Sequence, residues 1–317
     1  MRDPTNDFAA VILAALGHAP EVIEPGRMVR FATSGKRRDT PGWCKLFDDT
    51  RGGVFGCFRQ GISKTWSATD ARLMTPAERA TFAREVAAAT RERERQQRAE
   101  WAVNAKRIAS LWARCVPVTG GDPAHRYLCR RLKLDTLAVP ACLRVHPALD
   151  YWHDGKKLGK FAAMVAPLTA PDSRTVALHR TYLTDDGQKA DVPTVKKLTG
   201  TAGPLAGASI RLASPRGGVL GIAEGLETAL AAWLASGVPT VAAYCAGALA
   251  GYVWPAGVKR LVIFADADEA GRKAANNLRV RALRAWVSVN VMAPTDDSAD
   301  WADVWAARAG VTVEAAA

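Results

Sequence analysis

The sequence predicts an α/β protein: a small β-rich N-terminal module, a mixed α/β segment, and a C-terminal four-stranded parallel, Rossmann-like sheet. In the C-terminal third, short apolar runs alternate with helical stretches, which is the pattern of strand–helix–strand units. In residues 27–66, β-like runs alternate with glycines and charged turn residues, as in an antiparallel meander. The 317 residues, of which 49% are apolar and 23% charged, are enough for two or three folded domains.

Four parts of the chain are predicted from these patterns. They are a β-rich module, an exposed helical linker, a basic α/β subdomain and the parallel α/β domain, at residues 1–74, 75–115, 116–214 and 215–317. The linker helix begins at a capping box formed by Thr75 and Glu78, with proline at its first position. Its stretch RERERQQRAE (91–100) has no apolar face, which predicts a solvent-exposed helix.

The positive charge is concentrated in the middle of the chain. The whole chain carries a net charge of +12. Residues 76–214 account for +10 of it, whereas residues 1–75 carry +3 and residues 215–317 carry −1. A local excess of this size indicates a polyanionic partner such as nucleic acid.

Several protein classes are disfavoured. The apolar runs are too short to span a membrane, and the polar, acidic N-terminus does not resemble a signal peptide. The six cysteines include no C-x-x-C pair, so neither a disulfide framework nor a zinc ribbon is indicated. We therefore expect a cytoplasmic, basic, soluble protein that contacts no membrane.

The basic subdomain is predicted to contain one helix and one hairpin. PAHRYLCRRL (123–132) has helical character, and FAAMVAPLTA and TVALHRTYLT are two strands turning at Pro171–Ser173. Lys189, Lys196 and Lys197 then fall in an expected loop that ends at Thr199–Gly200.

The final third alternates strands with helices. Strands are predicted at 219–224, 239–245, 260–268 and 287–294, and helices at 225–236, 269–286 and 301–307. In parallel sheets of this kind, the working groups lie at the carboxyl ends of the strands.

Acidic residues occupy those strand ends. Glu224 ends the first strand and Asp266 and Asp268 end the third, while Asp300 and Asp303 follow the fourth. Carboxylates brought together repel one another unless a cation neutralises them, and oxygen ligands without histidine or cysteine favour Mg²⁺ or Mn²⁺. The pattern predicts a magnesium site of the kind used in phosphoryl transfer. Glu227, one helical turn beyond Glu224, is a secondary candidate.

These motifs resemble the Toprim domain of bacterial-type primases, topoisomerases and some nucleases. The resemblance rests on Glu224-Gly225 followed by FADADEAGRKAA (264–275), and DWADVW (300–305) is similar to the third acidic motif of that domain. The form EGLETALAA is similar to the phage and plasmid primase-like branch, which implies a mobile genetic element.

The resemblance extends to the preceding residues. LTAPDSRTVALHRTYLTDDGQKA…VKKLTG (168–200) is similar to the segment before the Toprim domain in bacterial DnaG-type primases. It implies contacts with template, primer or nucleoside triphosphate from His179, Arg180, Lys196 and Lys197, with Lys189 as a secondary candidate. Gly225 would let a phosphate approach the helix start.

The N-terminal module resembles the leading module of conjugative-plasmid and phage primases. A zinc-binding domain often occupies that place in the family. This chain has Cys44 and Cys57 there but no set of four ligands, so no zinc is expected.

The resemblance implies a DNA primase, a nucleotidyltransferase of the DNA-directed RNA polymerase type. Such an enzyme makes short primers on single-stranded DNA from nucleoside triphosphates, with Mg²⁺. Asp266 and Asp268 would hold the metal, assisted by Asp300 or Asp303, and Glu224 would be a metal ligand or a general base. The exposed helix is a candidate docking surface for a replicative helicase.

Two other functions remain open at this point. One is a Toprim nuclease, and the other is a catalytically inactive accessory replication protein that binds single-stranded DNA. The chain has no GxxxxGK[ST] sequence, so it is not itself a primase–helicase. Magnesium dependence separates the primase from the accessory binding protein, because DNA binding should persist in chelator whereas primer synthesis should stop.

Overall fold

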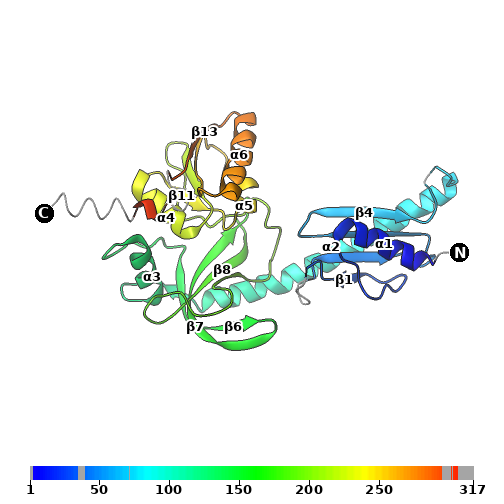
Figure 1. Cartoon of the computed structure of the whole chain (residues 1–317), viewed down its shortest axis with the longest axis horizontal. Coiled ribbons are helices and arrows are strands. Elements are labelled where there is room, and N and C mark those ends of the chain that lie inside the picture. Colours follow the sequence, from blue (N-terminus) through cyan, green and yellow to red (C-terminus); the bar gives the residue numbers. More distant parts are fainter. Residues whose placement is uncertain (1–2, 35–39, 71, 295–300, 302, 306–317) are drawn as a thin grey trace. The chain divides into compact units, whose positions relative to one another are not determined.

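The computed structural model describes residues 3–34, 40–70, 72–294, 301 and 303–305, in two compact units (Figure 1). The first unit comprises residues 1–100 and 152–156, and the second comprises residues 101–151 and 157–317. Among the helices within these described ranges, none is both long and apolar enough to cross a bilayer.

The first unit is a four-stranded antiparallel meander in the order β1-β2-β3-β4. Its strands are β1 (Val29–Phe31), β2 (Gly42–Leu46), β3 (Gly52–Cys57) and β4 (Ile62–Ser67). Side chains alternate between the two faces. One face packs against α1 (Pro4–Leu16) through Phe8 and Ile12, and the other packs against the first half of α2 (Pro76–Ala113) through Phe82 and Ala89.

The two cysteines of this module are core residues. Cys44 and Cys57 are fully buried against Phe8 and Phe55, and burial raises the pKa of the Cys44 thiol to about 12. Zinc requires thiolates, so this environment favours their role as small apolar side chains.

Helix α2 is packed at both of its ends. It begins at the expected capping box, where Glu78 accepts hydrogen bonds from the backbone and hydroxyl of Thr75 at 2.9 and 2.8 Å. Its last turns belong to the second unit and pack within it through Ile108 and Leu111. Between these contacts, residues 91–100 are exposed or half-buried. The sequence pattern captured that middle stretch and missed the packed ends.

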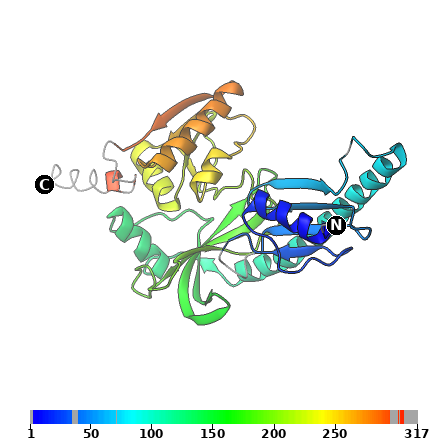
Figure 2. The ribbon, with the colours of Figure 1, turned by 45° about the vertical axis from the view of Figure 1, so that its right-hand side comes forward.

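The second unit contains two sheets (Figure 2). The first sheet is antiparallel, in the order β5-β6-β7-β8-β9, with strands Val116–Pro117, Arg144–His153, Lys156–Thr169, Thr175–Leu183 and Lys196–Leu198. Strands β7 and β8 form the expected hairpin, while β9 occupies part of the expected loop. Helix α3 (Pro123–Leu132) packs in the same core.

The second sheet is parallel, in the order β11-β10-β12-β13. Its strands are Thr240–Ala242, Val219–Ala223, Arg260–Phe264 and Ser288–Met292. Helix α4 (Leu226–Ser236) shares a core with α3 and the antiparallel sheet, while α5 (Ala246–Ala250) and α6 (Glu269–Arg284) cover the other face. This arrangement confirms the predicted parallel Rossmann-like sheet. The sequence pattern missed the short helix α5.

Candidate functional site

Three of the predicted acidic residues gather at the carboxyl edge of the parallel sheet. Strands β10 and β12 are neighbours, with Ala223 opposite Phe264. Glu224, which follows β10, and Asp266 and Asp268, which follow β12, therefore lie at the same edge of the sheet. Burial raises the pKa of Glu224, and repulsion from the carboxylates of Asp266 and Asp268 raises it further. A backbone N–H bond from Ala246 acts in the opposite direction. The carboxylates are therefore close enough to repel one another.

This set of oxygen donors fits a divalent cation in its chemistry. No three Asp, Glu, His or Cys side chains in the described ranges already converge in a metal-binding geometry. Mg²⁺ commonly uses one or two carboxylates and fills its remaining positions with water and substrate phosphates, so it needs no complete protein cage. Glu224, Asp266 and Asp268 supply such ligands, and a cation would remove the repulsion that raises the pKa of Glu224. Asp300, another predicted ligand, lies outside the described residues.

The turn that carries the two aspartates depends on Gly271. Asp268 caps α6, and its Oδ1 accepts a hydrogen bond from the backbone N–H of Gly271 at 2.6 Å. A Cβ atom at Gly271 would lie 2.8 Å from the carbonyl oxygen of Asp266 and 3.1 Å from Oδ1 of Asp268. Only glycine leaves room for both aspartates against the first turn of the helix.

Gly271→Ala should therefore disturb the acidic cluster more than it disturbs the fold. Alanine is the better helix former, but its methyl group meets the backbone of Asp266, so we expect the melting temperature to fall modestly. The added methyl group must displace the turn that holds Asp266 and Asp268, and we expect magnesium-dependent activity to fall by about tenfold. Gly247→Ala is a matched control, because a Cβ atom there would meet nothing within 4 Å. Unchanged activity in Gly271→Ala would contradict this account of the turn.

The third acidic motif is anchored by its tryptophans. Trp301 packs edge-to-face on Phe264 at 5.2 Å between ring centroids, and its Nε1–H donates to the carbonyl of Ala265 at 3.2 Å. Asp303, which the resemblance implies as a metal ligand, instead forms an ion pair with Arg131 at 2.9 Å. Its role as a metal ligand stays a prediction.

Glu227 is buried in a network of its own. Its side chain is 7% exposed, and its two oxygens accept hydrogen bonds from the Tyr127 hydroxyl and the Lys196 ammonium group, both at 2.7 Å. Burial alone would raise its pKa, but attraction to Lys196 and these two hydrogen bonds lower the pKa to about 2. Glu227 is therefore an ionised, fully satisfied carboxylate.

His179 lies beside this network and is buried. Burial lowers its pKa from 6.5 to about 4, with Glu227 opposing and Lys196 and Arg180 reinforcing the change. The imidazole is therefore neutral near pH 7, so it can offer a phosphate a hydrogen bond but no charge.

The buried imidazole makes stability fall on acidification. Because its pKa is lowered in the folded state, the unfolded chain takes up this proton first as the pH falls below 6.5. Stability that is complete above that pH should be lost progressively toward pH 4, by about 2 kcal/mol between roughly pH 8 and pH 5. Urea unfolding at several pH values measures this, and His179→Gln should remove that part of the pH dependence. An identical pH profile in the variant would exclude His179 as its source.

The basic residues expected near substrate separate onto two faces of the antiparallel sheet. Lys196 pairs with Thr181, and Lys197 pairs with Arg180, on adjacent positions of β9 and β8. Adjacent strand residues point to opposite faces. Arg180 is held in the sheet by a bond to the carbonyl of Leu198 at 2.6 Å, and Lys197 lies 4.7 Å over the ring of Tyr151. Lys196 forms the ion pair with Glu227.

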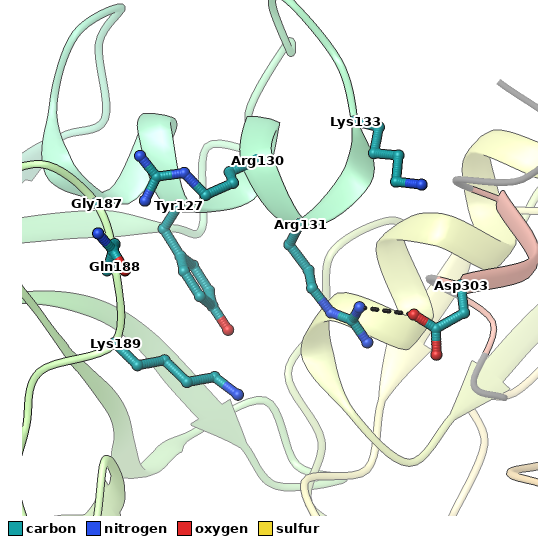
Figure 3. A pocket seen from close by; sticks show the side chains of 8 residues that line it. All are labelled: Tyr127, Arg130, Arg131, Lys133, Gly187, Gln188, Lys189 and Asp303. Carbon is teal, nitrogen blue, oxygen red and sulfur yellow. Dashed lines mark hydrogen bonds and ion pairs between the residues drawn. The ribbon is translucent and has the colours of Figure 1, made fainter. Parts of the chain in front are cut away.

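A basic pocket of about 510 Å³ lies beside α3 (Figure 3). Its lining contains four cationic side chains and one acidic one, which are Arg130, Arg131, Lys133, Lys189 and Asp303. The other lining residues are Tyr127, Gly187 and Gln188. The predicted secondary candidate Lys189 is therefore placed with cations that sequence analysis did not single out. A pocket with this charge balance suits phosphate groups.

Gly225 lies where phosphate approach was expected, at the N-cap of α4. Its backbone is extended, and a Cβ atom would lie 3.1 Å from the Thr228 hydroxyl oxygen. The small residue therefore keeps the start of the helix open.

Sequence reasoning missed Tyr127, Arg131 and Gly271 as contributors to this region. Their signals were weak, because Tyr127 and Arg131 belong to an ordinary amphipathic helix pattern. Gly271 was visible within the DADEAG motif, but its steric role requires knowledge of the turn.

Two family models match separate parts of the chain. Residues 219–310 match the Toprim domain, and residues 102–212 match a domain of unknown function (DUF7146). No curated protein matches the chain in sequence.

The chain is similar to several solved primase structures. The Aquifex aeolicus primase (zinc-binding and RNA polymerase domains) is 13% identical, with 99% of this chain and 84% of that chain covered and a TM-score of 0.43. The primase fragment of the bacteriophage T7 primase-helicase protein is 16% identical, with coverages of 59% and 67% and a TM-score of 0.37.

A DNA primase domain from Pseudomonas aeruginosa is 17% identical, with a TM-score of 0.35; the match covers 52% of this chain and 55% of that one, a little over half its length. With TM-scores below 0.5, none of these likenesses identifies a function by itself. The family match and the parallel strand order agree on the C-terminal part: residues 219–310 match the Toprim domain, and their described strands form the parallel sheet.

Proposed function

We propose that this chain is a DNA primase, a nucleotidyltransferase that joins nucleoside triphosphates on a single-stranded DNA template. The observation that carries the proposal is the cluster of Glu224, Asp266 and Asp268 at the carboxyl edge of the Toprim sheet. The strongly basic segment before it supports a polyanionic substrate, because residues 76–214 carry a net charge of +10.

In the proposed reaction, the 3′-hydroxyl of one nucleotide attacks the α-phosphate of the next and pyrophosphate leaves. Mg²⁺ held by Asp266 and Asp268 would neutralise charge on the phosphate oxygens. Glu224 either shares in holding the metal or accepts the proton of the attacking hydroxyl. Burial and the neighbouring carboxylates raise the pKa of Glu224, and Mg²⁺ bound beside it would lower that pKa again, so both roles are compatible with its surroundings.

The cations of the preceding subdomain would bind and orient the substrates. Lys196 and the pocket residues Arg130, Arg131 and Lys189 offer positive charge to the triphosphate or the template backbone. His179 is neutral and would contribute a hydrogen bond at most. The exposed stretch of α2 remains our candidate for contact with a replicative helicase.

Primer synthesis tests the proposal. The purified chain is incubated with single-stranded DNA, labelled nucleoside triphosphates and Mg²⁺, and products are separated on a gel. We expect short oligonucleotides that require the template and disappear in chelator. A nicked or shortened template without new oligonucleotides would indicate a Toprim nuclease instead. Tight DNA binding without either product would indicate an accessory binding protein.

A further inference from the structure

The ion pair of Glu227 and Lys196 joins three elements that are distant in sequence. Glu227 lies in the first turn of α4, Lys196 on β9, and Tyr127 on α3. Both carboxylate oxygens are used, one by each partner, at 2.7 Å. The network therefore determines where the ammonium group of Lys196 lies relative to the first turn of α4.

Burying the Glu227 carboxylate costs stability, because the charged group loses its contact with water. Apolar side chains of the same volume often give equal or greater stability. Stability alone therefore does not explain a carboxylate buried at this position. What the pair provides in addition is a charged lysine in a defined place.

Lys196 is the half of the pair that reaches solvent. Its side chain is 41% exposed, against 7% for Glu227. An ammonium group has three N–H donors, and one of them is used by Glu227. A lysine side chain is otherwise flexible and loses considerable rotamer entropy when a ligand immobilises it. Holding the ammonium group in advance removes that cost from ligand binding.

The surroundings are suited to an anionic ligand. Tyr127, the second partner of Glu227, also lines the basic pocket with Arg131 and Lys189. Glu227 has both oxygens occupied inside the protein, so it offers no direct contact to a ligand. Its influence on a phosphate must pass through Lys196.

We propose that Glu227 is a positioning residue, which together with Tyr127 holds Lys196 as a preorganised cation for phosphate oxygens of the bound nucleotide or nucleic acid. The inference rests on the proposed function for the identity of the ligand. It differs from the sequence-based expectation, which considered Glu227 beside the metal-binding acids.

The test measures the affinity of two phosphate probes at equilibrium. One is a fluorescent nucleoside triphosphate with Mg²⁺, and the other is a labelled single-stranded oligodeoxythymidylate in chelator. The variants are Glu227→Gln, Tyr127→Phe, Lys196→Met and the double variant Glu227→Gln/Lys196→Met. Glu92→Gln is the matched control, because it removes an ion pair with Lys45 of similar length, 2.6 Å, in the first unit. Affinities are measured where circular dichroism shows every variant folded.

Glu227→Gln should weaken binding of at least one probe by about tenfold, and Tyr127→Phe by roughly threefold, while Glu92→Gln leaves both unchanged. In the Lys196→Met background, Glu227→Gln should have almost no further effect, because the group it positions is gone. Loss confined to the nucleotide would assign Lys196 to the triphosphate, and loss confined to the oligonucleotide would assign it to the template backbone.

If the ion pair had only a structural role, Glu227→Gln would lower the melting temperature without changing the affinity of the folded protein for either probe. Unchanged affinity in folded Glu227→Gln, or equal losses with and without Lys196, would overturn the proposal. Failure of the unmodified chain to bind either probe would overturn it as well. Primer synthesis by the unmodified chain is measured in parallel. Its absence alone would count against the proposed function, and the binding cycle would still decide the role of Glu227.

Discussion

The double variant Asp266→Asn/Asp268→Asn should make no detectable primers and should fold at least as well as the unmodified chain. Asparagine keeps the shape of each side chain but removes the charge that a divalent cation needs, and we expect a loss of at least about 10³-fold in synthesis. Removing two negative charges near Glu224 also relieves repulsion, so the melting temperature should stay equal or rise.

The local structure tolerates these substitutions. Asp268 caps α6, and asparagine is an equally good N-cap residue. Gel analysis of primers and circular dichroism of the same preparation provide the two measurements. Asp172→Asn/Asp185→Asn is the matched control, because both carboxylates lie at exposed turns of the antiparallel sheet. Full synthesis by Asp266→Asn/Asp268→Asn would refute the proposed site.

The second large effect concerns stability rather than synthesis. Lys196→Met should destabilise the fold by about 3 kcal/mol, because it leaves the buried Glu227 carboxylate without its cation. Adding Glu227→Gln to the same chain should restore most of that loss, since the unpaired charge is then removed. Urea unfolding of the two single variants and the double variant measures the coupling.

The acid dependence provides an independent check on this pair. The pKa of Glu227 is lowered in the folded state, so its contribution is complete above its ordinary value of 4.5 and is lost as the pH falls toward 2. Glu227→Gln should remove that dependence. A double variant that is as unstable as Lys196→Met would show that the charge of Glu227 is not the cause.

Much of the parallel domain could be predicted from the sequence because its signals are local. Apolar runs of strand length and helices ending at glycine gave the strand–helix order, and Glu224, Asp266 and Asp268 follow from the rule that strand ends carry the functional groups. The capping box at Thr75 was equally readable, because its hydrogen bonds join residues three apart. Such features need no knowledge of distant parts of the chain.

In the basic subdomain, the local sequence did not predict the partners of the lysine side chains. Lys196 and Lys197 are adjacent in the sequence, but β9 turns one toward Glu227 and the other toward Tyr151. The expected loop gave no reason to separate them. A three-residue strand is specified by its pairing with β8 rather than by its own residues.

The amino-acid sequence was sufficient to predict the parallel sheet, the acidic residues at its carboxyl edge and the concentration of positive charge before it. These features depend on periodicity, spacing and composition, which are properties of neighbouring residues. The pairing of Glu227 with Lys196 and Tyr127, and of Asp303 with Arg131, could be seen only in the folded protein. The partners in these contacts lie 31 to 172 residues apart, and their pairing depends on how the packed cores bring those segments together.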